Sequence, residues 1–279
     1  MKSLEIGARR RALTLGLALT TLAAFSVPAA AQDRLRVSGT GSGIGGMQLL
    51  MESFVRANPG VQGDVLPALG SAGGIRAVID GKIELAVANR VPNDKERGMN
   101  ALNSAADART PLVIAVHKGL GITAITSDQL AGLYGEGKQN FPNGQRARPV
   151  LRLSDTTDTA IVKSISPAVA AAIDAAASRR GVLDGTTDSD TADLIERTPG
   201  AFGPSTLALI ESEKRPLAAL AIDGVAPTLA NLASGQWKLH KPLYMVWTDK
   251  PSAQLQRFVA FVQSAEGRRI LAAAGHGQP

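Results

Sequence analysis

The chain has 279 residues, of which 44% are hydrophobic and 19% charged, and it contains no cysteine. This length suffices for one large domain or two domains of about 120 residues, with a core that needs no disulfide. The net charge is +6 and no block of basic residues occurs beyond residue 31, so the composition argues against a nucleic-acid-binding protein.

Residues 1–31 have the pattern of a signal peptide. A basic start with Arg9–Arg11 precedes an apolar run, Ala12–Phe25, which is too short to span a membrane. Ala29–Ala31 is a small-residue cleavage signal, so Gln32 is the expected mature start. The pair Arg10-Arg11 leaves both Sec and twin-arginine export open. Without residues 1–31, 26 Lys and Arg face 23 Asp and Glu, a net charge of +3 that modestly favours an anionic small ligand.

A glycine-rich stretch, Gly39–Gly46, follows the short predicted strand 35–38. A predicted helix comes next, with one apolar stripe made by Ile44, Met47, Leu50, Met51, Phe54 and Val55. A second stretch of similar design is Leu69–Gly74, where Ser71 stands as the expected N-cap of the next helix. Helix starts favour anions, so two such stretches predict one shared anion site.

The first part of the mature chain reads as a β-α-β-α-β unit. Predicted strands at 61–66 and 83–88 follow the two helices, and the unit implies a parallel sheet with right-handed crossovers. Ligands of such sheets bind at the carboxyl ends of the strands. Ser38–Ser42, Ser71 and Asn89 all fall at those ends.

Further elements follow in order. We expect a helix over 92–104, an apolar strand over 110–117 long enough to cross between domains, a helix over 126–133 and a strand over 149–153. Ser154–Thr159 is a third polar helix start after a strand. The remaining expected helices are 168–177, 188–198, 205–213, 227–234, 252–263 and 265–274, with strands at 201–203, 217–222 and 239–247.

Three stretches, Gly39–Ser42, Leu69–Gly74 and Leu85–Asn89, resemble the N-terminal half of the phosphate-binding proteins of bacterial phosphate ABC transporters. In that family an Arg followed by a polar helix start completes the anion site, and Arg152 with Asp155–Thr159 is similar to it. The resemblance extends over most of the mature chain.

The resemblance implies an α/β, two-lobe periplasmic-binding-protein fold of type II, each lobe a mostly parallel sheet flanked by helices, hinged by two strand crossings. Lobe 1 would comprise 32–112 plus 225–279, and lobe 2 would comprise 113–224. The protein would be a periplasmic monomer without enzymatic activity or cofactor that captures phosphate or a similar tetrahedral oxyanion and delivers it to an ABC permease. The binding positions carried over are Thr40, Gly41, Ser42, Ser71, Asn89, Arg152, Thr156 and Thr157.

Two residues depart from the family pattern. The family usually has an Asp, which accepts the proton of hydrogen phosphate, where this chain has the neutral Asn89. The family's Ser-Gly-Thr helix start reads Thr156-Thr157-Asp158 here, and a carboxylate beside an anion is unfavourable unless it accepts a proton. Asp155 or Asp158 is therefore a candidate for the acceptor role, with helix capping as the alternative for Asp155.

Two other functions stay open. The departures at 89 and 158 would also suit a binding protein for another small anion or carboxylate that signals to a membrane sensor. Gly41-x-Gly43-x-x-Gly46, with Asp64 further on, matches the dinucleotide fingerprint and would suit an exported enzyme. His117, His240 and His276 lack metal-ligand spacing, so no metal site is predicted.

Overall fold

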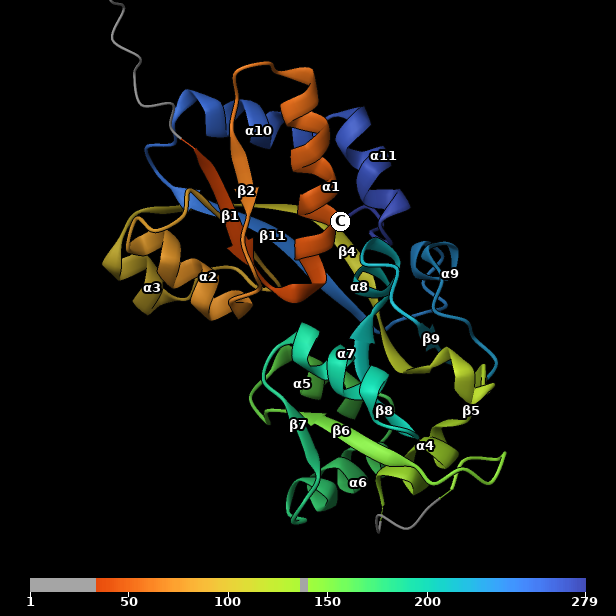
Figure 1. The fold of residues 1–279 in the computed structure, drawn as a ribbon. Coiled ribbons are helices and arrows are strands. Elements are labelled where there is room, and N and C mark those ends of the chain that lie inside the picture. Colours follow the sequence, from red (N-terminus) through yellow and green to blue (C-terminus); the bar gives the residue numbers. More distant parts are fainter. Residues whose placement is uncertain (1–33, 136–139) are drawn as a thin grey trace, which may run out of the picture. The chain divides into compact units, whose positions relative to one another are not determined.

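The computed structural model describes residues 34–135 and 140–279, so the predicted signal peptide and Gln32 lie outside the described residues. The chain begins with β1 (Leu35–Gly39), α1 (Gly41–Ala57), β2 (Gly63–Val65), α2 (Gly70–Ile79) and β3 (Leu85–Ala88). Strands β2 and β3 pair in parallel with β1, one on each side. Figure 1 shows β1 and β2. The predicted β-α-β-α-β unit is confirmed.

The glycine-rich stretch is mostly helix. The turn is confined to Gly39 and Thr40, because α1 already starts at Gly41. Gly39 has φ +143°, and a Cβ there would lie 1.9 Å from the carbonyl oxygen of Val87. Only glycine allows β1 to end in this conformation so close to β3.

A long strand, β4 (Leu102–His117), connects two groups of strands. Its first half pairs antiparallel with β11 (His240–Thr248), which also pairs with β3. The expected helix over 92–104 is therefore wrong beyond α3 (Asp94–Met99). Pairing with β11 from Leu102 onward overrides the local helical pattern, because long-range strand contacts outweigh weak intrinsic propensity.

The second half of β4 pairs with β8 (Ala201–Thr206) and β9 (Leu217–Ala219). Strand β6 (Arg148–Arg152) runs parallel to β8, and β7 (Leu183–Gly185) runs parallel to β6. The resulting sheet order is β2-β1-β3-β11-β4-β8-β6-β7, with β9 also on β4. A small parallel pair is formed by β5 (Ala124–Ile125) and β10 (Ala221–Ile222).

The remaining helices lie largely where the sequence predicts them. They are η1 (Lys118–Leu120), α4 (Ser127–Tyr134), α5 (Thr157–Lys163), α6 (Pro167–Ala177), α7 (Asp188–Arg197), α8 (Leu207–Ser212), α9 (Leu229–Ala233), α10 (Ala253–Gln263) and α11 (Ala265–Ala273). Some details differ from expectation. Strand β8 continues to Thr206, so α8 begins two residues late, and the sequence did not predict η1, β5 or β7. The strand expected over 217–222 is divided into β9 and β10.

The apolar stripe of α1 packs as predicted. Its residues Met47, Leu50, Met51 and Phe54 are buried, and the ring of Phe54 lies 5.2 Å from that of Phe258 in α10. A second cluster surrounds the apolar half of β4.

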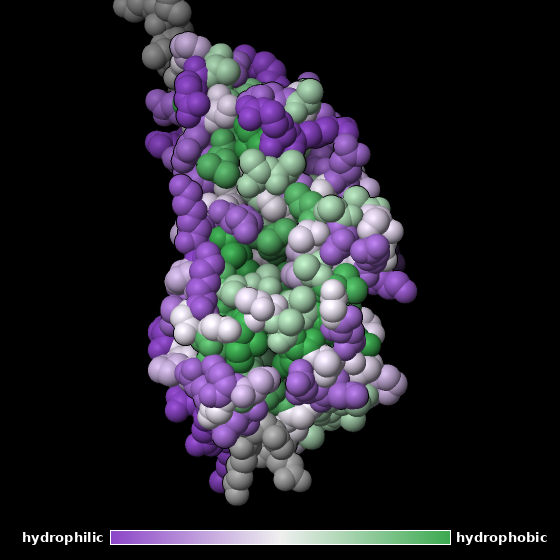
Figure 2. Space-filling view, turned by 90° about the vertical axis from the view of Figure 1, so that its right-hand side faces the viewer, coloured by the Kyte–Doolittle hydropathy of each residue, from purple (hydrophilic) through white to green (hydrophobic). Residues whose placement is uncertain are grey.

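On the face drawn in Figure 2, hydrophilic residues gather at the upper end and the margins, and hydrophobic ones lie in the middle. Within the described residues, no helix combines the length and apolar character needed to cross a membrane.

Asp107 is the extra residue of a β-bulge, since Leu243 pairs with Ala108 and Tyr244 with Ala106. Its Oδ2 is buried without a hydrogen-bond partner, and burial raises its pKa to about 6. The unfolded chain releases this proton near pH 3.8, so stability is expected to fall as pH rises from about 4 to 6.

Asp107→Asn is therefore expected to raise the free energy of unfolding by on the order of 1 kcal/mol at pH 7, with the gain vanishing near pH 4. Urea unfolding at several pH values measures this. Asp249→Asn, at an exposed position, is the control and should change little. A gain that persists at pH 4 would contradict the titration of Asp107.

Candidate functional site

A cavity of about 410 Å³ lies where several strands end and helices begin. Its lining includes the starts of α2, α5 and α7, together with Thr40 after β1 and Asn89 after β3. Of the predicted site residues, seven line it: Thr40, Ser71, Asn89, Arg152, Asp155, Thr156 and Thr157. Gly41 and Ser42 do not line the cavity; Ser42 is buried directly behind Thr40.

The start of α2 carries no side-chain cap. The helix begins at Gly70 with Leu69 as its N-cap residue, so the expectation that Ser71 caps this helix is wrong. Ser71 Oγ instead accepts a hydrogen bond of 3.0 Å from the backbone N–H of Asn89. Its own hydroxyl proton remains available, and the uncapped N–H groups of the helix start favour an anion.

The starts of α5 and α7 are capped by their own threonines. Thr156 accepts from the N–H of Thr159 and donates to the carbonyl of Leu153 at 2.9 Å. Thr187 forms a capping box with Asp190. Thr157 and Asp155 are exposed at the cavity. These two helix starts therefore contribute their dipoles and exposed polar groups, whereas the cap hydroxyls are already engaged.

The side chain of Asn89 is engaged in an internal network and is 6% exposed. Its Oδ1 lies 2.6 Å from Thr40 Oγ1 and 3.2 Å from Ser42 Oγ, and its Nδ2 donates to the carbonyl of Pro242 at 2.8 Å. Thr40 Oγ1 is also 2.9 Å from Asp188 Oδ2. A hydroxyl has one proton, so Asn89 and Asp188 share a single donor.

Four buried charges meet beside this network. Lys241 Nζ lies 2.8 Å from Asp188 Oδ1 and 2.6 Å from Asp158 Oδ1, the second contact being an ion pair without hydrogen-bond alignment. Arg152 Nε lies 3.1 Å from Asp158 Oδ2, and its Nη1 donates to the carbonyl of Gly185 at 2.9 Å. All four side chains are less than 10% exposed.

The pKa values of the two buried carboxyls, Asp158 and Asp188, are shifted in opposite directions. Burial raises the pKa of Asp158, and the negative charge of Asp188 adds to that rise. Burial also acts to raise the pKa of Asp188, but Lys241 and Arg152 outweigh it and hold that pKa below its usual value. Burial would lower the pKa of Lys241, yet the two carboxylates raise it. Lys241 and Asp188 are therefore charged at neutral pH, and Asp158 is the group that takes up a proton most readily.

Sequence reasoning missed Asp188 and Lys241. The signal for Asp188 was a fourth polar helix start, Thr186-Thr187-Asp188, hidden because β7 before it was not predicted. The signal for Lys241 was a lysine inside a strand rich in β-forming residues. A charged residue on such a strand is buried only with a partner, here the two carboxylates.

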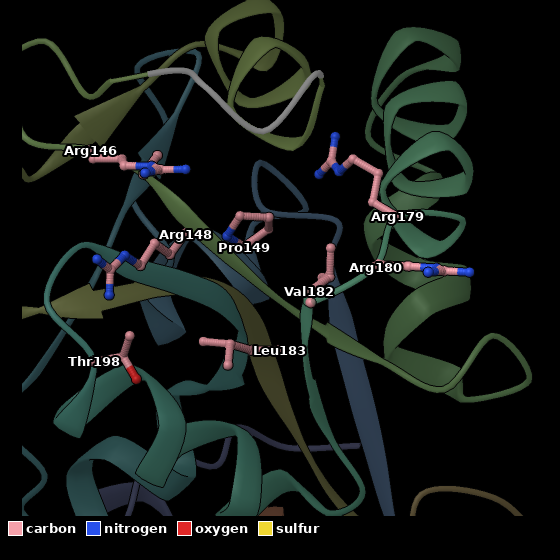
Figure 3. Close-up of a pocket in the computed structure, with 10 residues that line it drawn as sticks. Arg146, Arg148, Pro149, Arg179, Arg180, Val182, Leu183 and Thr198 are labelled. Atoms are coloured by element: carbon pink, nitrogen blue, oxygen red, sulfur yellow. The ribbon is translucent and has the colours of Figure 1, made fainter.

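A second cavity, of about 500 Å³, lies at the opposite ends of β6 and β7. Arg146 and Arg148 lie on one side of it and Arg179 and Arg180 on the other, with Pro149, Val182 and Leu183 between them (Figure 3). None of its described lining residues is acidic. Strand β6 thus carries an arginine at each end, Arg148 at this cavity and Arg152 at the first, about 13 Å apart along an extended chain.

The glycines of the predicted dinucleotide fingerprint, Gly41, Gly43 and Gly46, all lie inside α1. Asp64 lies in β2, where it forms an ion pair with Arg34 and does not line the cavity.

Within the described residues, no group of three His, Cys, Asp or Glu side chains is placed to hold a metal. His276 is buried, and burial lowers its pKa to about 4, so it is neutral.

Comparisons with known proteins agree on the fold. A family model described as a PBP superfamily domain matches residues 26–266. The phosphate-binding protein PstS of Bacillus subtilis (strain 168) is 23% identical over 240 residues, 84% of this chain and 78% of that protein.

Two solved structures extend the likeness. A candidate phosphate ABC transporter substrate-binding protein of Clostridium perfringens, with bound phosphate, has a TM-score of 0.71 at 19% identity and covers 88% of this chain and 100% of that one. An ABC-type phosphate transport receptor of Vibrio cholerae has a TM-score of 0.55 at 20% identity, with coverage of 88% and 100%. The predicted α/β fold of periplasmic binding proteins is confirmed.

Proposed function

Because the chain belongs to the PBP superfamily, we propose that it is a periplasmic solute-binding protein for phosphate or a similar tetrahedral oxyanion. The observation that carries this proposal is the cavity that joins Arg152 and Ser71 to the uncapped start of α2. A guanidinium, hydroxyls and helix N–H groups are the donors that replace the water shell of an oxyanion. The relatives named phosphate-binding proteins support the same ligand class.

Transport follows from closure around the ligand. We assign lobe 1 to 32–112 plus 225–279 and lobe 2 to 113–224. In support, β4 changes its partner from β11 to β8 between Pro111 and Leu112. A ligand that contacts both lobes stabilises the closed form, which an ABC permease then recognises. In this proposal the protein works as an exported monomer and catalyses no reaction.

The proton of the ligand has an acceptor in this site even though Asn89 is neutral. Asp155 and Asp158 both line the cavity, and they stand beside Arg152 rather than after β3. A carboxylate that accepts a hydrogen bond from a protonated phosphate would discriminate against fully ionised sulfate. In this proposal, Asp155 or Asp158 takes the acceptor role that the family gives to the Asp at position 89.

A thermal-shift screen of the mature protein with phosphate, sulfate, arsenate, molybdate, phosphonates and small carboxylates tests this function, with calorimetry on any hit. A ligand at a hundredfold excess over its Kd stabilises the folded state by about 2.7 kcal/mol. Stabilisation by phosphate and not by sulfate is the expected result. If folded, ligand-free protein responds to no oxyanion, the proposal is overturned.

Ser71→Ala is expected to weaken phosphate binding about tenfold, because a donor to the ligand is lost. It also leaves the N–H of Asn89 without its acceptor, so a loss of about 1 kcal/mol in unfolding free energy should accompany it. Calorimetry and urea unfolding measure the two effects. Ser212→Ala, which removes a helical hydroxyl bonded to Ala208 away from the cavity, is the control and should leave binding unchanged.

A second candidate is a sensing protein that binds another small anion or carboxylate and signals to a membrane receptor. The neutral Asn89 and the carboxylates in the cavity favour it. A small carboxylate as the best ligand in the same screen, or a sensor kinase gene beside this one in place of permease genes, would support sensing over transport.

A further inference from the structure

The start of helix α1 already holds an anion that belongs to the protein itself. Asp188 Oδ2 accepts hydrogen bonds from the backbone N–H of Ser42 at 3.1 Å and from the hydroxyl of Thr40 at 2.9 Å. Helix α1 has no other side-chain cap and no acidic residue in its first turn. Asp188 therefore provides the negative charge that the dipole of α1 attracts.

The position of this carboxylate is tightly determined. Asp188 is 5% exposed, and its second oxygen, Oδ1, lies 2.8 Å from Lys241 Nζ. A Cβ on Gly41 would lie 2.9 Å from Cβ of Asp188, so the glycine makes room for the approach. Both oxygens thus have partners on segments far away in the sequence, α1 and β11.

The buried charges beside the cavity cancel when Asp158 is ionised. Arg152 and Lys241 carry two positive charges, and Asp158 and Asp188 carry two negative ones when ionised. At the cavity, Arg90 is engaged by Glu96 in ion pairs of 2.7 Å. While Asp158 is ionised, a bound anion meets donors without a surplus of cations. Asp188 is ionised whether or not Asp158 holds a proton, so each extra negative charge on the anion is repelled by Asp188.

We infer that Asp188 is a specificity-determining residue that makes the cavity select singly charged oxyanions, such as dihydrogen phosphate or a monoanionic phosphate ester, over doubly charged ones. The inference rests on the proposed function in taking this cavity as the binding site. It goes beyond that function because it names the ionic form of the ligand and assigns the selection to a residue outside the predicted site.

The neutral residue at position 89 fits this inference. Asn89 Oδ1 and Asp188 Oδ2 both approach the one hydroxyl of Thr40. A carboxylate at 89 would place a second negative charge against the same donor, whereas the amide does not. Asn89→Asp is therefore expected to weaken binding of every oxyanion, and adding Asp188→Asn should restore it.

The test is calorimetry with sulfate, a dianion, and with phosphate from pH 5.5 to 8.5, on the wild type and on Asp188→Asn. The variant keeps the shape of the side chain and an oxygen that accepts from Ser42 N–H. Asp193→Asn removes one carboxylate from the same helix at an exposed position paired with Arg215, and it is the matched control. Urea unfolding establishes that all three proteins are folded.

In the wild type, phosphate should bind more tightly as pH falls, and sulfate weakly or not at all. Asp188→Asn should tighten sulfate binding at least about tenfold and flatten the pH profile for phosphate, while Asp193→Asn changes affinity less than about threefold. A folded Asp188→Asn protein with unchanged sulfate affinity and an unchanged pH profile overturns the inference, as does one that loses all anion binding.

Different measurements test the proposed function and the role of Asp188. Phosphate binding by the wild type judges the function, and sulfate binding by Asp188→Asn relative to Asp193→Asn judges the role of Asp188. Wild-type protein that binds no oxyanion at any of these pH values would overturn the proposed function and, with it, the inference. Wild-type protein that binds phosphate, beside an Asp188→Asn variant with no gain for sulfate, would support the proposed function and overturn the inference alone.

Discussion

Arg152→Ala is expected to weaken phosphate binding at least about a hundredfold, or about 3 kcal/mol. The guanidinium lines the cavity with an exposed fraction of 9%, and Asp158 and the carbonyl of Gly185 hold it there. A charge-assisted bond from a largely buried guanidinium to an oxyanion is strong. Calorimetry with phosphate measures the loss.

The matched control for this variant lies on the same strand. Arg148→Ala removes the same charge from the other end of β6, at the cavity lined by four arginines. It should change the affinity for phosphate less than about threefold. If Arg148→Ala abolishes binding and Arg152→Ala does not, the anion binds in the arginine-lined cavity, and the site proposed at Arg152 is wrong.

Lys241→Met is expected to be the most destabilising substitution at the site, lowering the free energy of unfolding by about 3–5 kcal/mol. Lys241 is 2% exposed and lies between Asp158 and Asp188, so its removal leaves two buried carboxylates with Arg152 as their remaining cation. Urea unfolding at pH 7 measures the loss. The loss should shrink at acidic pH, because protonation of the carboxyls removes the unpaired charge.

Two further variants separate this charge effect from a loss of packing. Lys241→Met combined with Asp188→Asn should recover much of the stability at pH 7, because one uncompensated charge is removed with its partner. Lys238→Met, at an exposed position of the same region, should stay within about 0.5 kcal/mol of the wild type. If the double variant is no more stable than Lys241→Met, the lysine acts by packing alone.

Local patterns were sufficient for the elements that form the first half of the site. The apolar stripe of α1 and the order of β1, β2 and β3 were read from periodicity, and they placed Thr40, Ser71 and Asn89 at one edge of the sheet. The strand that ends at Arg152 and the polar helix start after it were read in the same way, and the family resemblance then marked Arg152 and Thr156 as binding positions. These features depend on neighbours in the chain, and a short window of sequence contains them.

Local patterns failed where a distant segment decided the outcome. The helix expected over 92–104 ends early because β11 pairs with residues from Leu102 onward. Ser71 is not a cap, because α2 begins at Gly70, two residues earlier than a Ser71 cap requires, and its hydroxyl instead accepts a hydrogen bond from the backbone N–H of Asn89. Strand β7 is three residues long, too short to stand out by itself, and it forms by pairing with β6.

The sequence by itself determined the class of the protein: the alternation of strands and helices, the polar helix starts after strands, and the donors suited to an oxyanion. Only the tertiary structure decided the charge of the site. Asp188 and Lys241 are separated by 53 residues, and each joins Asp158 or α1 through contacts that no local pattern encodes. Electrostatic interactions depend on distance in space and on burial, and both are set only when the strands have paired and the helices have packed.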